Sequence, residues 1–289
     1  EVIKKISKKT RAIMAVDIFG HPCNIDKLKK ISKKYKLKLI TDSAQAPYSL
    51  YKNKIASTLS DVGGISLNYH KHIHTGEGGV VFTNSDKIAK KVKLIRNHAE
   101  SVVRSNNKND LSNMIGNNFR LGEIESAIGI EQLKKLKKEV IKKQKIAKLL
   151  SEGLAKIPGI ILPKTVSGYT HSYYVYGINL DLKFLKHTRD HIIKKLRSKG
   201  VPGMGSGYTC LHLLPMFQKK IAYGHNGFPW NSDIYNGNVS YSKGICPNAE
   251  YFHTKSFISF AICLYDLNIN DVNFIINSFK KVWKELKIN

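Results

Sequence analysis

The N-terminal part of the chain alternates apolar runs of strand length with segments of helical spacing. Residues 11–19 form the first apolar run, which a Gly-His-Pro sequence ends. Asn24 is placed to cap a helix that continues to Tyr35. A second apolar run begins at Leu37 and leads into Asp42 and small residues. A strand, a helix and a strand in this order predict a βαβ unit and a parallel sheet.

Two further apolar runs, 63–68 and 79–83, predict two more strands. Ser85 can cap a helix that continues to Ile95. Residues 122–150 have the spacing of one long helix, in which the pairs of neighbouring lysines form the solvated face. The apolar side of this helix consists of Ile124, Ala127, Ile128, Leu133, Leu136 and Val140.

The pattern changes near Ser151, where Pro, Gly and alternating aromatic residues follow. Beyond this point, 190–199 and 270–287 have helical spacing. We therefore predict an α/β chain of two domains, 1–150 and 151–289, with a mostly parallel sheet flanked by helices. The last helix carries an apolar stripe of Val272, Ile275, Ile276, Phe279, Val282 and Trp283.

The formal net charge of +27 invites comparison with nucleic-acid-binding proteins, but the kind of basic residue argues against specific binding. Of the 48 basic residues only six are arginine, the better reader of phosphates and base edges. The lysines are spread along the whole chain. We expect a solvated lysine surface and no specific nucleic-acid partner.

No apolar run reaches the roughly 18 residues that a membrane-spanning helix needs, so we expect no membrane insertion. The cysteines form no CxxC pair, which argues against a zinc ribbon and against a disulfide framework. A reduced, cytoplasmic setting is the simplest account. The four cysteines are Cys23, Cys210, Cys246 and Cys263.

The stretch NYHKHIHTGEGG, residues 68–79, is the most unusual part of the chain and has three interpretations. On a strand, His70, His72 and His74 would share one face and could bind a metal ion. The GEGG sequence could cradle a phosphate, although it does not match GxxxxGK[ST] and a strand follows it. Alternatively, Lys71 could be a reactive lysine.

The reactive-lysine interpretation uses more of the chain. A lysine that forms a Schiff base must lie near an aldehyde cofactor and be desolvated or charge-tuned, so that its amine can attack. Pyridoxal phosphate also needs a carboxylate on its pyridinium nitrogen. Asp42 ends a predicted strand, where α/β sheets bind ligands, and precedes Lys71 in the chain. These residues alone leave the three interpretations open.

Five segments resemble, in order and spacing, successive motifs of the DegT/DnrJ/EryC1/StrS family of pyridoxal-phosphate sugar aminotransferases. They are FGHPCNIDKL, ITDSAQAPYS, ISLNYHKHIHTGEGGVVFTN, IRNHAES and IGNNFRLGEIESAIGIEQL, and a looser match continues to the C-terminus. The resemblance implies fold type I. Residues 1–150 would be the remainder of the large, cofactor-binding domain, and 151–289 a smaller C-terminal α/β domain.

By this resemblance, Lys71 binds the cofactor covalently and then acts as general acid and base. Asp42 would pair with the pyridinium nitrogen, Ala44 would lie against the ring, and Gln45 would approach the ring hydroxyl. Ser66 would hold the cofactor phosphate. One branch of the family has histidine in place of the lysine, but the fifth residue after Ser66 is Lys71, so this chain keeps the aminotransferase residue.

The family's GxNxRM segment matches Gly116, Asn118 and Arg120, with Leu121 in place of Met, and Leu67 stands where Phe is usual. Asn118 would reach the cofactor phosphate of the neighbouring subunit, which implies a homodimer with shared active sites. The resemblance implies no metal. Four histidines are candidates for contact with the substrate, with a packing role as the alternative: His70, His72, His171 and His212.

The resemblance predicts an enzyme that moves an amino group, with glutamate as the expected donor, to a nucleotide-linked keto sugar in surface polysaccharide biosynthesis. Family members begin with a Gly-Ser/Thr turn that holds the cofactor phosphate and with an aromatic residue or histidine that stacks on its ring. This chain is expected to begin after both. The alternative is therefore a non-catalytic or regulatory protein on the same fold.

Overall fold

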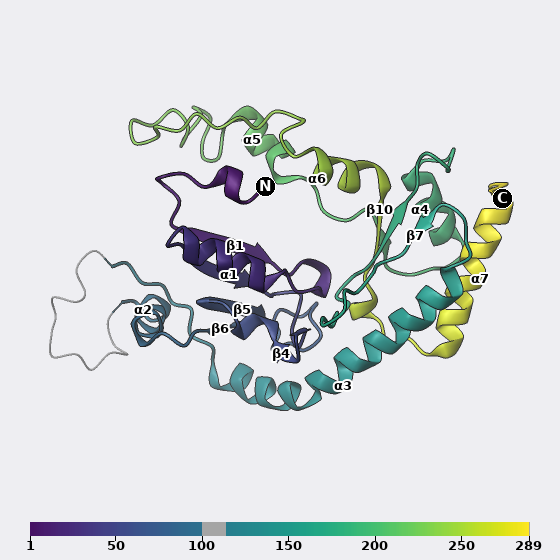
Figure 1. The fold of residues 1–289 in the computed structure, drawn as a ribbon, viewed down its shortest axis with the longest axis horizontal. Helices are drawn as coiled ribbons and strands as arrows, with labels where there is room; N and C mark the ends of the chain where they lie inside the picture. The colour runs from purple at the N-terminus through teal and green to yellow at the C-terminus, as the bar shows by residue number, and fades with distance from the viewer. Residues whose placement is uncertain (100–113, 289) are drawn as a thin grey trace. The chain divides into compact units, whose positions relative to one another are not determined.

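A computed structural model of the chain describes residues 1–99 and 114–288 (Figure 1). The chain divides into two compact units. The first unit consists of Glu1–Ala147, Lys164–Val175 and Ile262–Asp266. The predicted domain boundary between residues 150 and 151 stays a prediction; the two later segments of the first unit lie beyond it.

The first unit contains a four-stranded sheet in the order β1-β2-β5-β6. Its strands are β1 (Ala12–Val16), β2 (Lys38–Asp42), β5 (Val62–Ser66) and β6 (Gly79–Phe82). The first three are parallel, and β6 runs antiparallel to β5. The α/β class and the mostly parallel sheet predicted from the sequence are confirmed.

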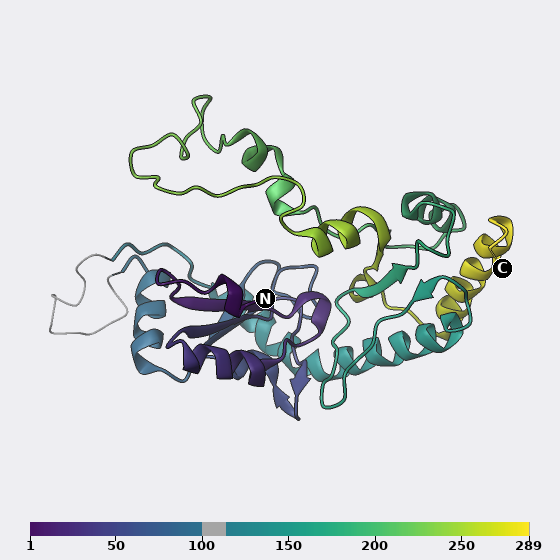
Figure 2. The ribbon, with the colours of Figure 1, turned by 45° about the horizontal axis from the view of Figure 1, so that its top comes forward.

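Two helices of the first unit begin at the predicted caps. In α1 (Ile25–Lys34), the Asn24 side chain accepts a hydrogen bond from the backbone N–H of Lys27. In α2 (Asp86–Arg96), Ser85 caps in the same way. Helix α1 lies along the sheet (Figures 1 and 2), where Ile25 packs with Leu39 of β2 in a buried apolar cluster.

Helix α3 (Glu123–Leu154) is the predicted long helix and has 32 residues. The second part of its predicted apolar side is core, since Leu136 and Val140 are buried against Leu67 and Ile73. The first part is exposed: Ile124 is 75% and Leu133 60% accessible. Apolar spacing therefore located the helix correctly, but only part of its apolar side is buried.

The first unit also has several short elements. Strands β3 (Leu50–Tyr51) and β4 (Lys54–Ile55) form an antiparallel pair. The remaining elements among the described residues of this unit are the single 3₁₀ turns η1 (Ile3–Lys5), η2 (Ile18–Gly20), η3 (Ala56–Thr58) and η7 (Ile262–Leu264).

The second unit consists of Lys148–Pro163, Tyr176–Ala261 and Leu267–Asn289. Its sheet has the order β7-β8-β10-β9, and every neighbouring pair is antiparallel. These strands are β7 (Ile160–Ile161), β8 (Tyr176–Leu180), β9 (Met204–Gly205) and β10 (Phe257–Phe260). Its shorter helices are α5 (Pro215–Lys219), α6 (Pro247–Tyr251), the 3₁₀ turn η5 (Leu211–Leu213) and the π-turn η6 (Phe252–Ser256).

The predicted helices near the C-terminus are present as α4 (Arg189–Ser198) and α7 (Ile269–Glu285). Asn268 begins α7 with a capping box that Asp271 completes. All six residues of the predicted apolar stripe on α7 are buried, which confirms that prediction. No helix among the described residues is long and apolar enough to cross a membrane.

Candidate active site

The candidate site lies at the edge of the first unit's sheet where β2 and β5 end. Asp42 is the last residue of β2, and Ser66 is the last residue of β5. Because these strands are parallel, both side chains are placed at their carboxyl ends, the edge at which α/β sheets bind ligands. The Asp42 carboxylate accepts a hydrogen bond of 3.0 Å from the backbone N–H of Ala44, which fixes its orientation.

The turn after β2 is held by a buried carboxylate that the sequence did not single out. Ser43 donates through its hydroxyl to Asp17 at 2.6 Å, and both side chains are fully buried. Asp17 also accepts from the backbone N–H of Cys23 at 2.7 Å. Gln45 accepts from the backbone N–H of Phe19 at 2.7 Å. Asp42 and Ala44 are thus presented by a turn with its own hydrogen-bond network.

Lys71 lies in the turn after β5, where its backbone N–H donates to the carbonyl of Asn68 at 2.9 Å. The side chain is half-buried, and its ammonium lies 4.4 Å from the centre of the Tyr174 ring. Burial lowers the pKa of Lys71, and the electrostatic attraction of Cys263 and Asp42 opposes this effect in part. A larger share of neutral amine follows, as nucleophilic attack requires.

His72 is buried next to Lys71 in sequence. One ring nitrogen, Nε2, donates to the carbonyl of Ser172 at 2.8 Å, while Nδ1 is buried with no hydrogen-bond partner among the described residues. Burial lowers the pKa of His72 to about 4, against the opposite effect of the Ser172 hydrogen bond. His72 is therefore neutral near pH 7 and fastens the chain around residue 172 to the Lys71 turn.

The other two histidines of this stretch take different directions. The His70 ring lies 3.8 Å from the Tyr69 ring, and its carbonyl accepts from the Cys263 thiol at 3.5 Å. His74 is exposed. These residues form a turn rather than the strand that the metal interpretation needed. Within the described part of the chain, no three or more His, Cys, Asp or Glu side chains are grouped to hold a metal ion.

His171 belongs to the segment of the first unit that His72 holds. Its Nδ1 accepts from the backbone N–H of Tyr173 at 2.9 Å, and its ring stacks on the Tyr173 ring at 4.0 Å. Burial, together with His21 and His72, lowers the pKa of His171 to about 3. His21, whose ring lies 5.5 Å away, was not a predicted site residue. His72 and His171 are both buried and neutral near pH 7, and His72 is part of the Lys71 turn.

His212 lies in the second unit. Its Nε2 is 2.9 Å from a carboxylate oxygen of Glu250, which also accepts from the backbone N–H groups of Gly244 and Cys246. This network ties the loop before α6 together. Contact with the substrate stays a prediction for all four candidate histidines: His70, His72, His171 and His212. Three of these rings, those of His72, His171 and His212, already form hydrogen bonds within the protein.

The two residues expected to hold the cofactor phosphate differ in exposure. The half-buried Ser66 hydroxyl accepts from the backbone N–H of Asn68 at 3.2 Å. Asn118 is exposed, and its backbone forms a bridge with Asn97. Arg120 donates to the Asn97 side chain at 2.5 Å, which fixes the strand-like segment that presents Asn118.

Lys143 of α3 contradicts the prediction that the lysine pairs of this helix form its solvated face. It is only 6% exposed, and its ammonium donates to the carbonyl of Tyr265 at 2.5 Å. Burial lowers the pKa of Lys143, and burial raises the pKa of the Cys263 thiol to about 12. Its neighbour Lys142 is more exposed and forms an ion pair with Asp266. Spacing could not separate the two lysines, because a chain segment far along the sequence covers one of them.

Known proteins share this arrangement of elements and motifs. The model of the DegT/DnrJ/EryC1/StrS aminotransferase family matches residues 1–244. The GDP-perosamine synthase of Vibrio cholerae is 34% identical over 218 residues, which are 75% of this chain and 58% of that protein. The UDP-4-amino-4,6-dideoxy-N-acetyl-beta-L-altrosamine transaminase of Helicobacter pylori is 27% identical over 292 residues, 99% of this chain and 69% of that protein.

A solved structure extends the likeness to three dimensions. Helicobacter pylori PseC, an aminotransferase involved in the biosynthesis of pseudoaminic acid, matches with a TM-score of 0.78 and 25% identity. The match covers 98% of this chain and 70% of that one. The chain therefore spans between 58% and 70% of the length of these three proteins. The predicted fold and the resemblance seen in the motifs are confirmed.

Proposed function

Since the chain belongs to the DegT/DnrJ/EryC1/StrS aminotransferase family, a family of enzymes, we propose that it is a pyridoxal-phosphate-dependent aminotransferase of nucleotide-linked keto sugars. The observation that carries the proposal is the environment of Lys71. Lys71 is half-buried, with its amine against Tyr174 and close enough to Asp42 for an electrostatic interaction. Burial lowers the pKa of this amine. An amine in this setting is suited to attack an aldehyde.

The residues around Lys71 fit pyridoxal phosphate in kind. Asp42 offers a carboxylate, fixed by Ala44, to the pyridinium nitrogen. Ala44 is small enough to lie beneath a flat ring, and Ser66 offers a hydroxyl to the phosphate. Gln45 remains the proposed neighbour of the ring hydroxyl. When bound, the cofactor supplies an electron sink next to the carbon that gains or loses the amino group.

The residues of the chain itself would contribute proton transfer and orientation of the reacting groups. Lys71 would move the proton at the substrate carbon that gains or loses the amino group, and burial lowers its pKa, which favours the neutral amine that acts as base. The Tyr174 ring stabilises the ammonium form of Lys71 by a cation–π interaction. His72 is neutral, and its hydrogen bond to the Ser172 carbonyl positions the turn. It is therefore not a proton donor in the reaction.

The substrate and assembly complete the proposal. The activities named for the Vibrio cholerae and Helicobacter pylori relatives support a nucleotide-linked sugar as amino acceptor. Glutamate as donor and surface polysaccharide as the end product are proposed from the resemblance of the motifs to the family. Asn118, exposed on a fixed segment, supports a homodimer in which it reaches the neighbouring subunit's cofactor phosphate. The four cysteines are free thiols, which supports a cytoplasmic enzyme.

Absorbance spectroscopy tests the proposal. Pyridoxal phosphate added to the purified protein should give a saturable band at the violet edge of the visible range, and Lys71→Ala should abolish it. Borohydride reduction and peptide mapping then identify the labelled amine. Lys143→Ala is the matched control, because Lys143 is also buried with a lowered pKa but is bonded to Tyr265.

Two outcomes would overturn the assignment. A label on Lys143 or on surface lysines alone would remove Lys71 from the reaction. Absence of any saturable band would favour the non-catalytic alternative on the same fold. If the band forms, amino transfer from glutamate to a panel of nucleotide-linked keto sugars identifies the acceptor.

A further inference from the structure

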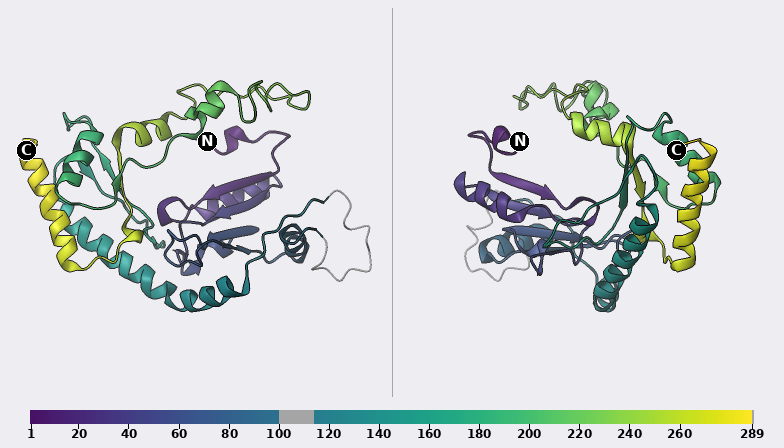
Figure 3. Two further views of the ribbon diagram at one scale, coloured as in Figure 1. Left: turned by 180° about the vertical axis from the view of Figure 1, so that it is seen from behind. Right: turned by 45° about the vertical axis from the view of Figure 1, so that its right-hand side comes forward.

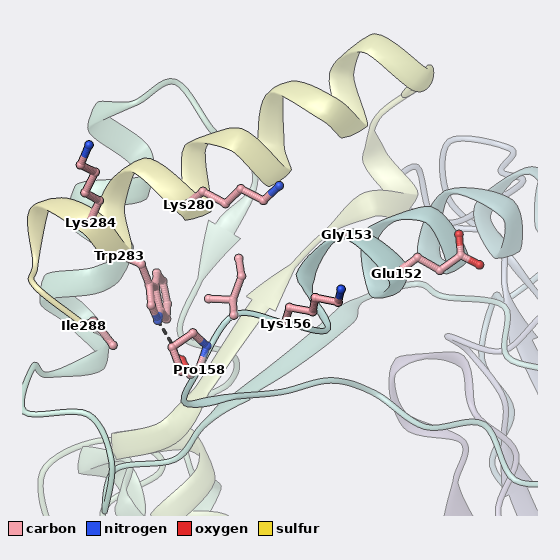
Figure 4. Close-up of a pocket in the computed structure, with 9 residues that line it drawn as sticks. Glu152, Gly153, Lys156, Pro158, Lys280, Trp283, Lys284 and Ile288 are labelled. Carbon is pink, nitrogen blue, oxygen red and sulfur yellow. Dashed lines mark hydrogen bonds between the residues drawn. The ribbon is translucent and has the colours of Figure 1, made fainter.

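The second unit contains a pocket of about 590 Å³ between the end of α3 and α7 (Figure 4). This volume lies in the range of small-molecule sites. The apolar part of its lining comes from Ile157, Pro158, Trp283 and Ile288. Trp283 is 3% exposed, and its indole N–H donates to the Pro158 carbonyl at 2.8 Å. The indole ring is therefore held in place, and its only hydrogen-bond donor has a partner.

Close packing of two helices builds this pocket. A Cβ on Gly153, near the end of α3, would lie 2.2 Å from the Cδ1 atom of Ile276 on α7. The glycine thus allows the last turn of α3 to lie directly against the middle of α7, and the end of α3 lies beside α7 in Figure 3. A wall made of two packed helices is more rigid than a surface loop.

The polar part of the lining is basic. Lys156 and Lys280 direct their ammonium groups to the same side of the pocket, whereas Lys284 directs its own away (Figure 4). Neither Lys156 nor Lys280 forms an ion pair with any residue that the structure describes. The one carboxylate of the lining, Glu152, is paired with Lys148 at 3.8 Å. Two uncompensated positive charges therefore stand beside an apolar floor.

We propose that this pocket binds a nucleoside phosphate, with the base over the apolar floor and the phosphate between Lys156 and Lys280. Arginine binds phosphate through its fork, but lysine also binds phosphate, as a point charge that imposes no fixed direction. A flat base would cover the apolar surface next to the indole. The site would be separate from the Lys71 site in its residues and would not require aminotransferase activity.

Tryptophan emission gives a direct readout. The chain has two tryptophans, so Trp230→Phe leaves Trp283 as the sole reporter. ADP should change this emission saturably, with one ADP bound per chain by equilibrium dialysis. Lys156→Gln combined with Lys280→Gln should weaken ADP binding at least about tenfold, a change that both methods resolve. Lys284→Gln should have a much smaller effect, since its ammonium points away.

Two controls separate a built site from general attraction by a chain of formal charge +27. Lys8→Gln combined with Lys9→Gln removes the same charge from the exposed N-terminal segment and should leave ADP binding unchanged. An equal loss in both double variants would overturn the proposal. Adenosine and pyrophosphate should each bind at least about tenfold more weakly than ADP.

The ligand series decides the class of ligand. Pyrophosphate that binds as tightly as ADP would reduce the pocket to a plain anion site and refute the role of the floor. Adenosine as tight as ADP would refute the role of the lysines. Equilibrium dialysis on the unsubstituted protein repeats the series if Trp230→Phe does not fold, and absence of saturable binding there refutes the proposal outright.

Discussion

Gly20 lies where three segments of the first unit meet, and we predict that Gly20→Ala is strongly destabilising. Its φ is +107°, in the region that favours glycine. Its carbonyl accepts from the Ser49 hydroxyl at 2.7 Å and from the backbone N–H of Ser172 at 2.9 Å. A Cβ at this position would lie 2.4 Å from the Ser172 hydroxyl oxygen and 2.9 Å from the Tyr173 nitrogen.

Two costs add in this substitution. A residue with a side chain loses about 1–2 kcal/mol in the left-handed region. Overpacking at the Cβ adds about 1–3 kcal/mol, because the Tyr173 nitrogen is backbone and can move only with its segment. The free energy of unfolding should therefore fall by about 2–5 kcal/mol. The same displacement would move Tyr174, and with it the surroundings of Lys71.

Urea unfolding followed by circular dichroism measures this loss, and Gly244→Ala is the matched control. Gly244 has a φ of +100°, but an added Cβ there meets no atom within 4 Å. Only the conformational cost of about 1–2 kcal/mol applies to it. The overpacking argument would be refuted if both variants lost the same stability. Gly20→Ala combined with Ser172→Ala should recover part of the loss, since the nearest colliding atom is then absent.

Three further substitutions test the surroundings of Lys71. Tyr174→Leu removes a ring that favours the ammonium form, so the pKa of Lys71 should fall further and amine labelling at pH 7 should become faster, whereas Tyr174→Phe should retain the parent rate. The pKa of His72 falls from 6.5 to about 4 on folding, so the unfolded chain takes up its proton first on acidification. Between pH 7 and pH 5 His72 should therefore remove about 2 kcal/mol from the free energy of unfolding, and His72→Gln should flatten the measured pH dependence by that amount. Lys143→Ala should cost about 2–3 kcal/mol by urea unfolding, because it leaves a cavity and removes the buried hydrogen bond to the Tyr265 carbonyl, while Lys142→Ala should change little.

Local patterns in the sequence were sufficient for the four-stranded sheet of the first unit and for helices α1, α2, α3, α4 and α7, but they predicted none of the strands of the second unit's sheet. Asn24 and Ser85 begin their helices where side chain–backbone caps are formed, and the apolar stripe on α7 is wholly buried. These features depend on residues a few positions apart, which a pattern records directly. The exposed Ile124 and Leu133 on α3 show the limit, since spacing reports that a side is apolar and not what covers it.

The alternating histidines show a second limit. Their spacing suggested a strand with one metal-binding face, but the backbone turns at Asn68, which bonds to the N–H groups of both His70 and Lys71. As a result His70 is half-buried, His72 is buried and His74 is exposed to solvent. The resemblance to family motifs pointed to Lys71 instead, because it used distances along the chain to Ser66 and Asp42 and not the histidine pattern.

Contacts distant in sequence explain why the environment of Lys71 could not be predicted. His72 bonds to Ser172, and Lys71 lies against Tyr174, across about a hundred positions of sequence. Cys263, still further along the chain, bonds to the carbonyl of His70. These residues carry no recognisable motif, yet they determine how far the lysine is buried and hence how its pKa shifts. Substitutions at Ser172 or Tyr174 should therefore alter the reactivity of Lys71 without touching any residue of its motif, and amine labelling of Lys71 in Ser172→Ala and Tyr174→Leu would reveal this coupling.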